Sequence, residues 1–304
     1  MAGITKTDVE ELIDTQVANE IFEGVVRESK ALQVMNRLPN MTSDQTKSRV
    51  LDTLPVAYFV DESTNNGRKN ITKLAWDKKM INAEELAVIV PIKENLLNDA
   101  SIDIWAQVKP RLIEALGRKI DDAIFNGNGK PAGWRNGLIP SILSVGAQVT
   151  EGTDFYSDIN DAMVKVEESG YNVTGAIGGV GLKGKFRMLV DRNGQPIKGT
   201  EIDELSKVFV DNGTWDKTSA TMIVGDFKQA VYAIRQDVTY KVLDQAVIQD
   251  PSTGEILYNL AQEDMVALRV VMRLGWEIPN PVNAENETNS RFPFASIVPQ
   301  GASI

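Results

Sequence analysis

A helical pattern of apolar residues between about 99 and 126 is the feature that most constrains this chain. Apolar side chains recur there every three or four residues, which places them along one face of an α-helix. They are Ile102, Trp105, Val108, Leu112, Leu116, Ile120 and Ile124. At roughly 1.5 Å per residue such a helix is about 40 Å long, so we expect it to act as a spine. Pro110 lies within it and predicts a kink or a split, because proline removes a backbone hydrogen bond and clashes with the preceding turn.

Strands are predicted on both sides of this helix. Residues 85–92 form a β-branched run that indicates a buried strand, and residues 266–276 alternate as a strand with one core face does. In the middle of the chain we expect a helix from Ser157, as its cap, to Ser169, and another over 185–190. Further strands are expected at 173–177, 221–224 and 231–243. The chain has no internal repeat, and this mixture of elements predicts an α+β fold.

A long hairpin is predicted before the spine. Residues 56–60 and 71–81, the latter carrying Trp76, have strand-forming sequences, and residues 61–70 form a turn-rich loop. From residue 68 of the tip to residue 81 of the return strand, basic residues are concentrated against the single acid Asp77. The basic residues are Arg68, Lys69, Lys73, Lys78 and Lys79. Two interpretations stay open: a solvated hairpin end, or a docking arm whose cations bind an acidic neighbour.

The amino-terminal segment has the pattern of an amphipathic helix. Thr7 and Glu10 have the spacing of a capping box. Apolar residues follow at three- or four-residue steps and form one face. They are Val9, Leu12, Ile13, Val17, Ile21 and Val25. This face either docks on another molecule or packs on the chain's own domain, and the sequence favours neither.

The chain contains no histidine and no cysteine. This excludes His-centred triads, cysteine nucleophiles, zinc fingers, iron–sulfur sites and disulfides, since each needs an imidazole or a thiolate. Any remaining chemistry would rest on carboxylates, lysines, hydroxyls or a borrowed cofactor, and we single out no catalytic, cofactor-binding or metal-binding residue. The formal net charge of −10 disfavours general nucleic-acid binding. No apolar run is long enough to span a membrane, so we expect a protein that works in the cytosol without a membrane partner.

One glycine-rich segment resembles a nucleotide site. Residues 179–184 follow the Gly-x-Gly-x-x-Gly pattern, with Asp203 nineteen residues beyond. Lys185 nearly completes a phosphate loop, but Phe186 stands where a serine or threonine is needed for magnesium. We expect a surface turn before a helix, and keep a nucleotide-binding enzyme that uses the Gly179–Lys185 loop as an alternative of a different class.

Adjacent carboxylates are the other possible route to catalysis. Neighbours on a helix point about 100° apart and so do not share a site. We expect these pairs to lie on solvated faces. The pairs are Glu10–Glu11, Glu84–Glu85, Asp121–Asp122, Glu167–Glu168 and Glu263–Asp264.

Several local sequences, in a fixed order, carry a family resemblance. They are LPVAYFVDE at 54–62, ELAVIVPIKENLLND at 85–99, DDAIFNGNG at 121–129 with GL at 137–138, DRNGQP at 191–196, VGDFKQA at 224–230 with IRQ at 234–236, and MVALRVVMRLGW at 265–276. With these pieces the chain closely resembles the major capsid proteins of tailed bacteriophages with the HK97-like fold. The resemblance covers nearly the whole chain, and the order and spacing of the pieces carry it rather than any single one.

The resemblance implies an HK97-like capsid fold with four parts. These are an N-arm with its amphipathic helix at 1–48, an extended E-loop hairpin at 49–82, a P-domain with the spine helix at 83–135 and 262–304, and a mixed A-domain at 136–261. The E-loop is then expected to reach over an adjacent subunit. The expected assembly contacts are its basic residues and the apolar residues Val9, Leu12, Ile13, Val17 and Ile21.

The resemblance also implies a function. The chain is expected to be a structural subunit, not an enzyme, of an icosahedral or prolate phage head. It would assemble with itself as hexamers and pentamers into a shell that encloses double-stranded DNA without sequence-specific binding. A separate scaffolding protein and a portal are expected partners, and assembly is expected in the host cytoplasm before the protein resides in the virion capsid. A cellular encapsulin-like compartment shell is the alternative within the same fold.

Some relatives join subunits by a Lys–Asn isopeptide bond, aided by a glutamate. The candidates in this chain are Lys69, Lys73 and Lys78, with Asn283 or Asn286 and Glu285 or Glu287.

Overall fold

The predicted spine is helix α5, Ile104–Phe125. The computed structural model describes residues 20–53, 55, 75–95, 104–190, 202, 205–285 and 291–301. Within them α5 runs without interruption through Pro110, so the predicted split is wrong. Pro110 is exposed, and its missing N–H removes a single hydrogen bond, while the apolar stripe from Leu112 to Ile124 is buried and holds the helix in place.

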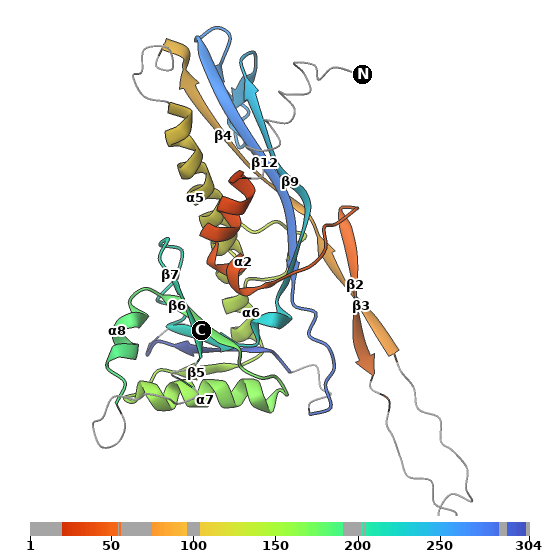
Figure 1. Ribbon diagram of the computed structural model, residues 1–304, viewed down its shortest axis with the longest axis vertical. Coiled ribbons are helices and arrows are strands. Elements are labelled where there is room, and N and C mark those ends of the chain that lie inside the picture. The colour runs from red at the N-terminus through yellow and green to blue at the C-terminus, as the bar shows by residue number, and fades with distance from the viewer. Residues whose placement is uncertain are drawn as a thin grey trace, which may run out of the picture.

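A long sheet lies along the spine helix (Figure 1). Its strand order is β1-β9-β12-β4. The central strand β12 pairs antiparallel with both β9 and β4, whereas β1 pairs parallel with β9. The bounds are Asn36–Arg37 for β1, Glu84–Lys93 for β4, Val231–Leu243 for β9 and Met265–Glu277 for β12. The strands predicted at 231–243 and 266–276 are thus confirmed.

Two burial predictions for this sheet are wrong. We expected β12 to have one core face and one exposed face, but only Arg269 is exposed along it. The second face is partly covered by Ile81 and Ala83 at one end of the strand and by Leu260 at the other. We expected β4 to be buried, but from Glu84 to Ile89 its residues alternate between half-buried and exposed, and only Ile92 is buried. The reason is that Leu86, Val88 and Val90 pack on the core around α5 while the opposite face of the strand meets solvent.

A second, five-stranded sheet forms the other end of the molecule (Figure 1). Its order is β5-β13-β8-β6-β7. Met222, Val224 and Ala295 pack with the buried side of α7 on one face, while Ile223 and Phe294 belong to the cluster around α5 and α6 on the other. The strands are β5 Gln148–Thr150, β6 Gly175–Gly179, β7 Ser206–Val210, β8 Met222–Gly225 and β13 Phe294–Val298. The helices are α6 Leu138–Ser144, α7 Phe155–Glu168, α8 Leu182–Arg187 and the 3₁₀ turn η1 Phe227–Gln229.

The cap predicted for α7 is wrong. Asp154 is the N-cap, and its carboxylate accepts from the N–H of Tyr156 at 3.1 Å. The Ser157 hydroxyl donates to the same carboxylate at 2.8 Å from inside the helix. Asp154 precedes the apolar residues of the helix directly, as an N-cap does.

The chain divides between the two sheets at other positions than the predicted domain boundaries. Residues 231–243, assigned to the A-domain by resemblance, form β9 of the long sheet. Residues 294–298, assigned to the P-domain, form an interior strand of the five-stranded sheet. Strand pairing decides this grouping, and periodicity along the chain carries no information about pairing partners.

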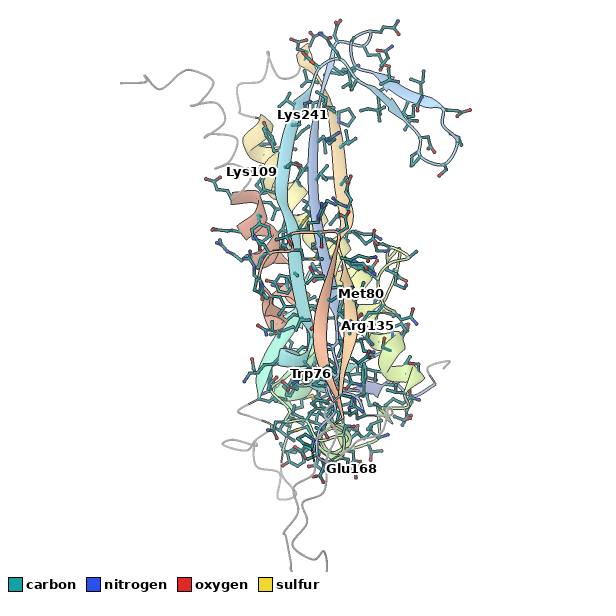
Figure 2. The ribbon with its side chains drawn as sticks, turned by 90° about the vertical axis from the view of Figure 1, so that its right-hand side faces the viewer. Trp76, Met80, Lys109, Arg135, Glu168 and Lys241 are labelled. Carbon is teal, nitrogen blue, oxygen red and sulfur yellow. The ribbon has the colours of Figure 1, made fainter. Side chains whose placement is uncertain are left out.

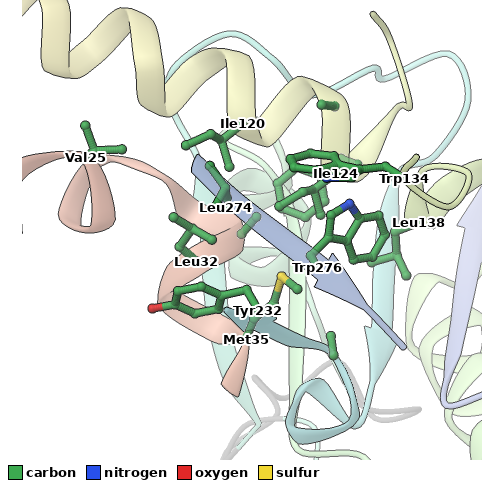
Figure 3. Packing of buried hydrophobic residues seen from close by; sticks show 14 of the residues in the cluster. Val25, Leu32, Met35, Ile120, Ile124, Trp134, Leu138, Tyr232, Leu274 and Trp276 are labelled. Atoms are coloured by element: carbon green, nitrogen blue, oxygen red, sulfur yellow. The ribbon is translucent and has the colours of Figure 1, made fainter. Parts of the chain in front are cut away.

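The described part of the amino-terminal segment packs on the spine. Residues 20–28 are helical, and a second helix, α2, spans Lys30–Val34. Ile21 and Val25 are fully buried in the core that α5 shares with the long sheet (Figure 3). Gly24 lies so close to Ile113 of α5 that a side chain there would clash. For residues 20–28, therefore, packing on the chain's own domain is the correct alternative.

The carboxylate of Asp121 joins three parts of the chain. It accepts hydrogen bonds from the Ser29 hydroxyl at 2.6 Å, from the N–H groups of Lys30 and Ala31 at 3.0 Å each, and from the Asn212 amide at 2.6 Å. Asp121 is completely buried, so the prediction of a solvated face is wrong for this residue. Burial raises the pKa of its carboxyl above the ordinary value, and the four hydrogen bonds lower it in part.

Two hairpins project from this body. The first pairs β2, Gln45–Thr53, with β3, Ala75–Asn82. β3 confirms the described part of the predicted return strand, whereas its partner β2 precedes the predicted first strand, which lies with the tip outside the described residues. The second pairs β10, Val247–Gln249, with β11, Ile256–Asn259, through a turn that contains Asp250 and Pro251. In the described part of the chain no helix has the length and apolarity needed to cross a bilayer.

We predict that Asp121→Ala destabilises the fold by about 3 kcal/mol, because it leaves donors of two other segments, residues 29–31 and Asn212, without their acceptor. Thermal or urea unfolding of the full chain measures the change. Asp161→Ala, an exposed carboxylate on α7, is the matched control and is expected to stay within about 0.5 kcal/mol of the wild type. Equal stability of the two variants would contradict the role given to Asp121.

Candidate functional site

The β2–β3 hairpin presents a basic, partly apolar face. Opposed residues in an antiparallel pair point to the same side, and Lys47 pairs with Met80. Lys78 and Trp76 lie two and four residues before Met80 and so share that side. All four are exposed, Trp76 at 60%. We call these four residues the basic face; Figure 2 shows Trp76 and Met80 on the strand that carries them.

The predicted assembly residues fall in different places. Lys78 belongs to the basic face, but Lys79 pairs with Ser48 and points to the opposite side, which it shares with Asp77. Ile21 lies inside the chain's own core at 1% exposure, so its side chain is not presented to a neighbour. The other predicted contacts lie outside the described residues: Val9, Leu12, Ile13, Val17, Arg68, Lys69 and Lys73.

The isopeptide candidates are only partly described. Lys78 is exposed on β3, while the Asn283 amide donates to the Ser169 carbonyl at 2.8 Å beside α7. Lys69, Lys73, Asn286 and Glu287 lie outside the described residues.

A single carboxylate fixes the root of the hairpin to the long sheet. Asp44, directly before β2, lies 2.7 Å from Arg235 of β9 and 2.7 Å from Arg273 of β12. The Asp44 carbonyl also accepts from the N–H of Ala83, at the far end of β3, at 2.8 Å. Both strands of the hairpin are therefore held at their base, and the direction of its outer part follows from there.

Backbone contacts hold the same root from the other side. The Asn82 carbonyl lies so close to Gly275 of β12 that any side chain at Gly275 would push the hairpin away. Asn82 also donates to the Gly133 carbonyl at 2.7 Å and accepts from the Trp134 indole at 3.2 Å. The hairpin thus leaves a rigid base, which is what a projecting contact arm needs.

The glycine-rich segment lines an open cleft of about 330 Å³. The Lys185 ammonium forms an ion pair with Glu151, which also accepts from the Thr221 hydroxyl at 2.8 Å. The lysine that a phosphate loop would need is therefore already neutralised. Asp203, the other residue of the nucleotide alternative, lies outside the described residues. Among the described residues, no cluster of three acidic side chains offers a metal site.

The pKa of Glu151 follows from these contacts. Burial raises the pKa of its carboxyl, but the hydrogen bonds from Lys185 and Thr221, together with the charge of Lys185, outweigh burial and hold the pKa below its ordinary value. The ionised carboxylate thus ties the end of β5 to Lys185 of α8 and to Thr221 before β8.

Sequence reasoning missed the residues that position the hairpin. Asp44 stands in a polar stretch with no pattern of its own, and its two arginines come from distant strands. A weak signal was present: Arg273 interrupts an apolar strand, and an arginine in such a strand needs an acidic partner. The identity of that partner is set by the sheet order alone.

Comparison with known proteins identifies the family to which this architecture belongs. A family model described as the phage capsid family matches residues 10–284. The chain belongs to the phage capsid family. The major capsid protein of Staphylococcus phage 80alpha is 26% identical over 270 residues, which are 85% of this chain and 79% of that protein.

Solved structures agree with this family. One from Microbacterium phage Oxtober96 is 33% identical, covers 90% of this chain and 91% of its own, and has a TM-score of 0.77. One from Mycobacterium phage Adephagia is 26% identical, covers 91% of each chain and has a TM-score of 0.78. The capsid protein therefore has the HK97-like fold and is a structural subunit that assembles into the shell of a virion. Neither alternative function is favoured by these relatives.

We predict that Asp44→Ala loosens the hairpin of the capsid protein without unfolding its body. Asp44 is largely exposed, so the loss of stability is expected to stay near about 1 kcal/mol. Hydrogen exchange is expected to become several-fold faster in β2 and β3 and to stay unchanged in β9. Asp77→Ala, which removes an acid from the hairpin itself, serves as control, and equal exchange in both variants would contradict the role of Asp44.

We predict a pH-dependent effect for Glu151→Gln. Because the folded pKa of Glu151 lies below its unfolded value, its contribution to stability is present above about pH 4.5 and is lost as the pH falls through the folded pKa. The melting temperature of the variant is expected to lie below that of the wild type at pH 7, and the gap is expected to close toward pH 3. Glu168→Gln, at an exposed site, should show no such gap at either pH.

Proposed function

We propose that this capsid protein builds an icosahedral or prolate phage head from hexamers and pentamers of itself. The observation that carries the proposal is the basic face of the β2–β3 hairpin. It holds Trp76 at 60% exposure on a rigid arm outside both sheets. A two-stranded hairpin with exposed aromatic and apolar side chains is marginal in water and gains stability by covering them on another molecule.

The parts of the subunit follow from the family. We propose residues 1–48 as the N-arm, 49–82 as the E-loop, and the long sheet with α5 as the P-domain. The five-stranded sheet, including β13, is proposed as the A-domain. The E-loop reaches over an adjacent subunit and uses the basic face, with Arg68, Lys69 and Lys73 as further proposed contacts. Val9, Leu12, Ile13 and Val17 remain proposed contacts of the N-arm.

The remaining partners follow from charge and chemistry. A net charge of −10 supports a shell that encloses double-stranded DNA without sequence-specific adhesion. A scaffolding protein and a portal are the proposed assembly partners, and assembly takes place in the host cytoplasm. The subunit acts without catalysis: it has no histidine or cysteine, and Lys185 is paired with Glu151.

We predict that the purified full chain, or the chain coexpressed with its scaffolding protein, forms closed shells or capsomers. Sedimentation and electron microscopy measure this. Trp76→Ser is expected to lower the yield of shells by roughly ten-fold, because the loss recurs at every subunit contact. Met188→Ser, at an 80% exposed methionine away from the hairpin, is the matched control. A wild-type chain that stays a monomer under all of these conditions would contradict the proposed function.

A further inference from the structure

The β10–β11 hairpin carries a second exposed surface. It leaves the far end of the long sheet, between the end of β9 and the start of β12, and projects from the body (the pale blue strands at the top of Figure 2). Large apolar side chains are exposed on it, with Ile256 at 62%. The others are Val247, Leu257 and Tyr258. Successive strand residues point to opposite faces, so both faces of this two-stranded hairpin carry exposed apolar side chains, which favours its coverage by another molecule.

The charge of this hairpin is uniformly negative. Residues 244–264 contain five acidic residues and no lysine or arginine; we call this segment the acidic hairpin. Asp250 is engaged in its own turn, where it accepts from the N–H groups of Ser252 and Thr253. The side chains of Asp244 and Glu255 have no partner among the described residues and are exposed. They are available to a cation brought by another molecule.

The basic face has the complementary character. Lys47 and Lys78 flank Trp76 and Met80 on one side of the β2–β3 hairpin, and no acid shares that side among the described residues. Both surfaces thus combine exposed apolar side chains with charge of one sign, and the signs are opposite. Matching potentials of this kind steer association and fix the register of a contact.

Within one chain the two surfaces are kept apart. The β2–β3 hairpin is anchored at Gly275, near the end of β12, and the acidic hairpin joins β12 at Met265. Ten residues of extended strand separate these points by roughly 33 Å. From its anchor the β2–β3 hairpin points away from the acidic hairpin (Figures 1 and 2). The acidic hairpin can therefore meet a basic face only on another copy.

We propose that the acidic hairpin of one subunit docks on the basic face of a second copy of this chain. The inference rests on the proposed function and names the partner surface for its projecting arm. The contact is head-to-tail, since each copy offers one surface of each kind at different places. When this contact is repeated around a ring of subunits, the ring closes. When it is repeated over a shell, many weak ionic contacts together stabilise the assembly.

Reversing the charges tests the pairing. Lys47→Glu with Lys78→Glu, or Asp244→Lys with Glu255→Lys, is expected to lower the shell yield by at least about ten-fold. All four changes in one chain are expected to restore the yield to within about three-fold of the wild type. Circular dichroism and melting curves of each variant verify folding.

Matched controls carry the same change of net charge elsewhere. Lys217→Glu with Lys228→Glu, and Asp161→Lys with Glu168→Lys, alter exposed residues outside both surfaces and are expected to assemble normally. Unchanged assembly of either reversed pair, or no recovery in the combined variant, overturns the proposal. Unchanged assembly of a reversed pair is also the outcome expected if the acidic hairpin binds a different protein.

Crosslinking tests the contact without shells. The chain has no cysteine, so Met80→Cys and Ile256→Cys introduce single thiols. The two variants, carrying tags of different length, are mixed and oxidised, and a disulfide forms only where the Cα atoms approach within about 7 Å. We expect a mixed dimer on a non-reducing gel, and at least about five-fold less when Lys79→Cys, on the opposite side, replaces Met80→Cys.

The outcomes separate this inference from the proposed function. Wild-type shells without the selective mixed dimer would overturn the hairpin pairing and leave the shell function intact. A selective mixed dimer from a wild-type chain that forms no shell would support the pairing and contradict the shell function.

Discussion

The carboxylate of Asp121 is the interaction on which the arrangement of the subunit depends. It lies near the end of the spine helix and receives donors from the amino-terminal helices and from the loop after β7. A buried carboxylate with its acceptor sites filled has little freedom to shift, since any movement leaves donors unsatisfied in an apolar surrounding. The spine, the amino-terminal segment and the five-stranded sheet are therefore held in one relative position.

The projecting hairpins depend on this rigid frame in different ways. The β2–β3 hairpin is positioned by the charge of Asp44, by the close approach of Gly275 and by an apolar cluster at its root that includes Ile81 and Ala83. The acidic hairpin roots in a small apolar cluster of Leu260, Met265 and Ala267. The ion pairs of Asp44 weaken as the salt concentration rises, whereas apolar contacts do not, so a part of the first root responds to solution conditions.

The sequence predicted elements better than it predicted their surroundings. The spine follows from periodicity, because its buried apolar residues face one continuous core, and β9 follows from its strand-forming residues. The edge position of β4, the placement of β13 and the burial of Asp121 depend on partners far along the chain: Ser29 and Asn212 lie 92 and 91 residues from Asp121. Asp44 and Arg273 are 229 residues apart. No local pattern carries such pairings. The sequence therefore named Lys78 as an expected contact but not the residues that position its hairpin.

The interleaving of the two sheets has a consequence for how the subunit is made. β13 follows the other four strands of the five-stranded sheet in the sequence, yet it lies between β5 and β8. A ribosome must release residues 294–298 before that sheet can close, because the gap between β5 and β8 stays open until then. A chain interrupted before β13 keeps this gap and lacks the buried side chains of Phe294 and Ile297. The fold thus admits to the shell only subunits whose synthesis has passed β13.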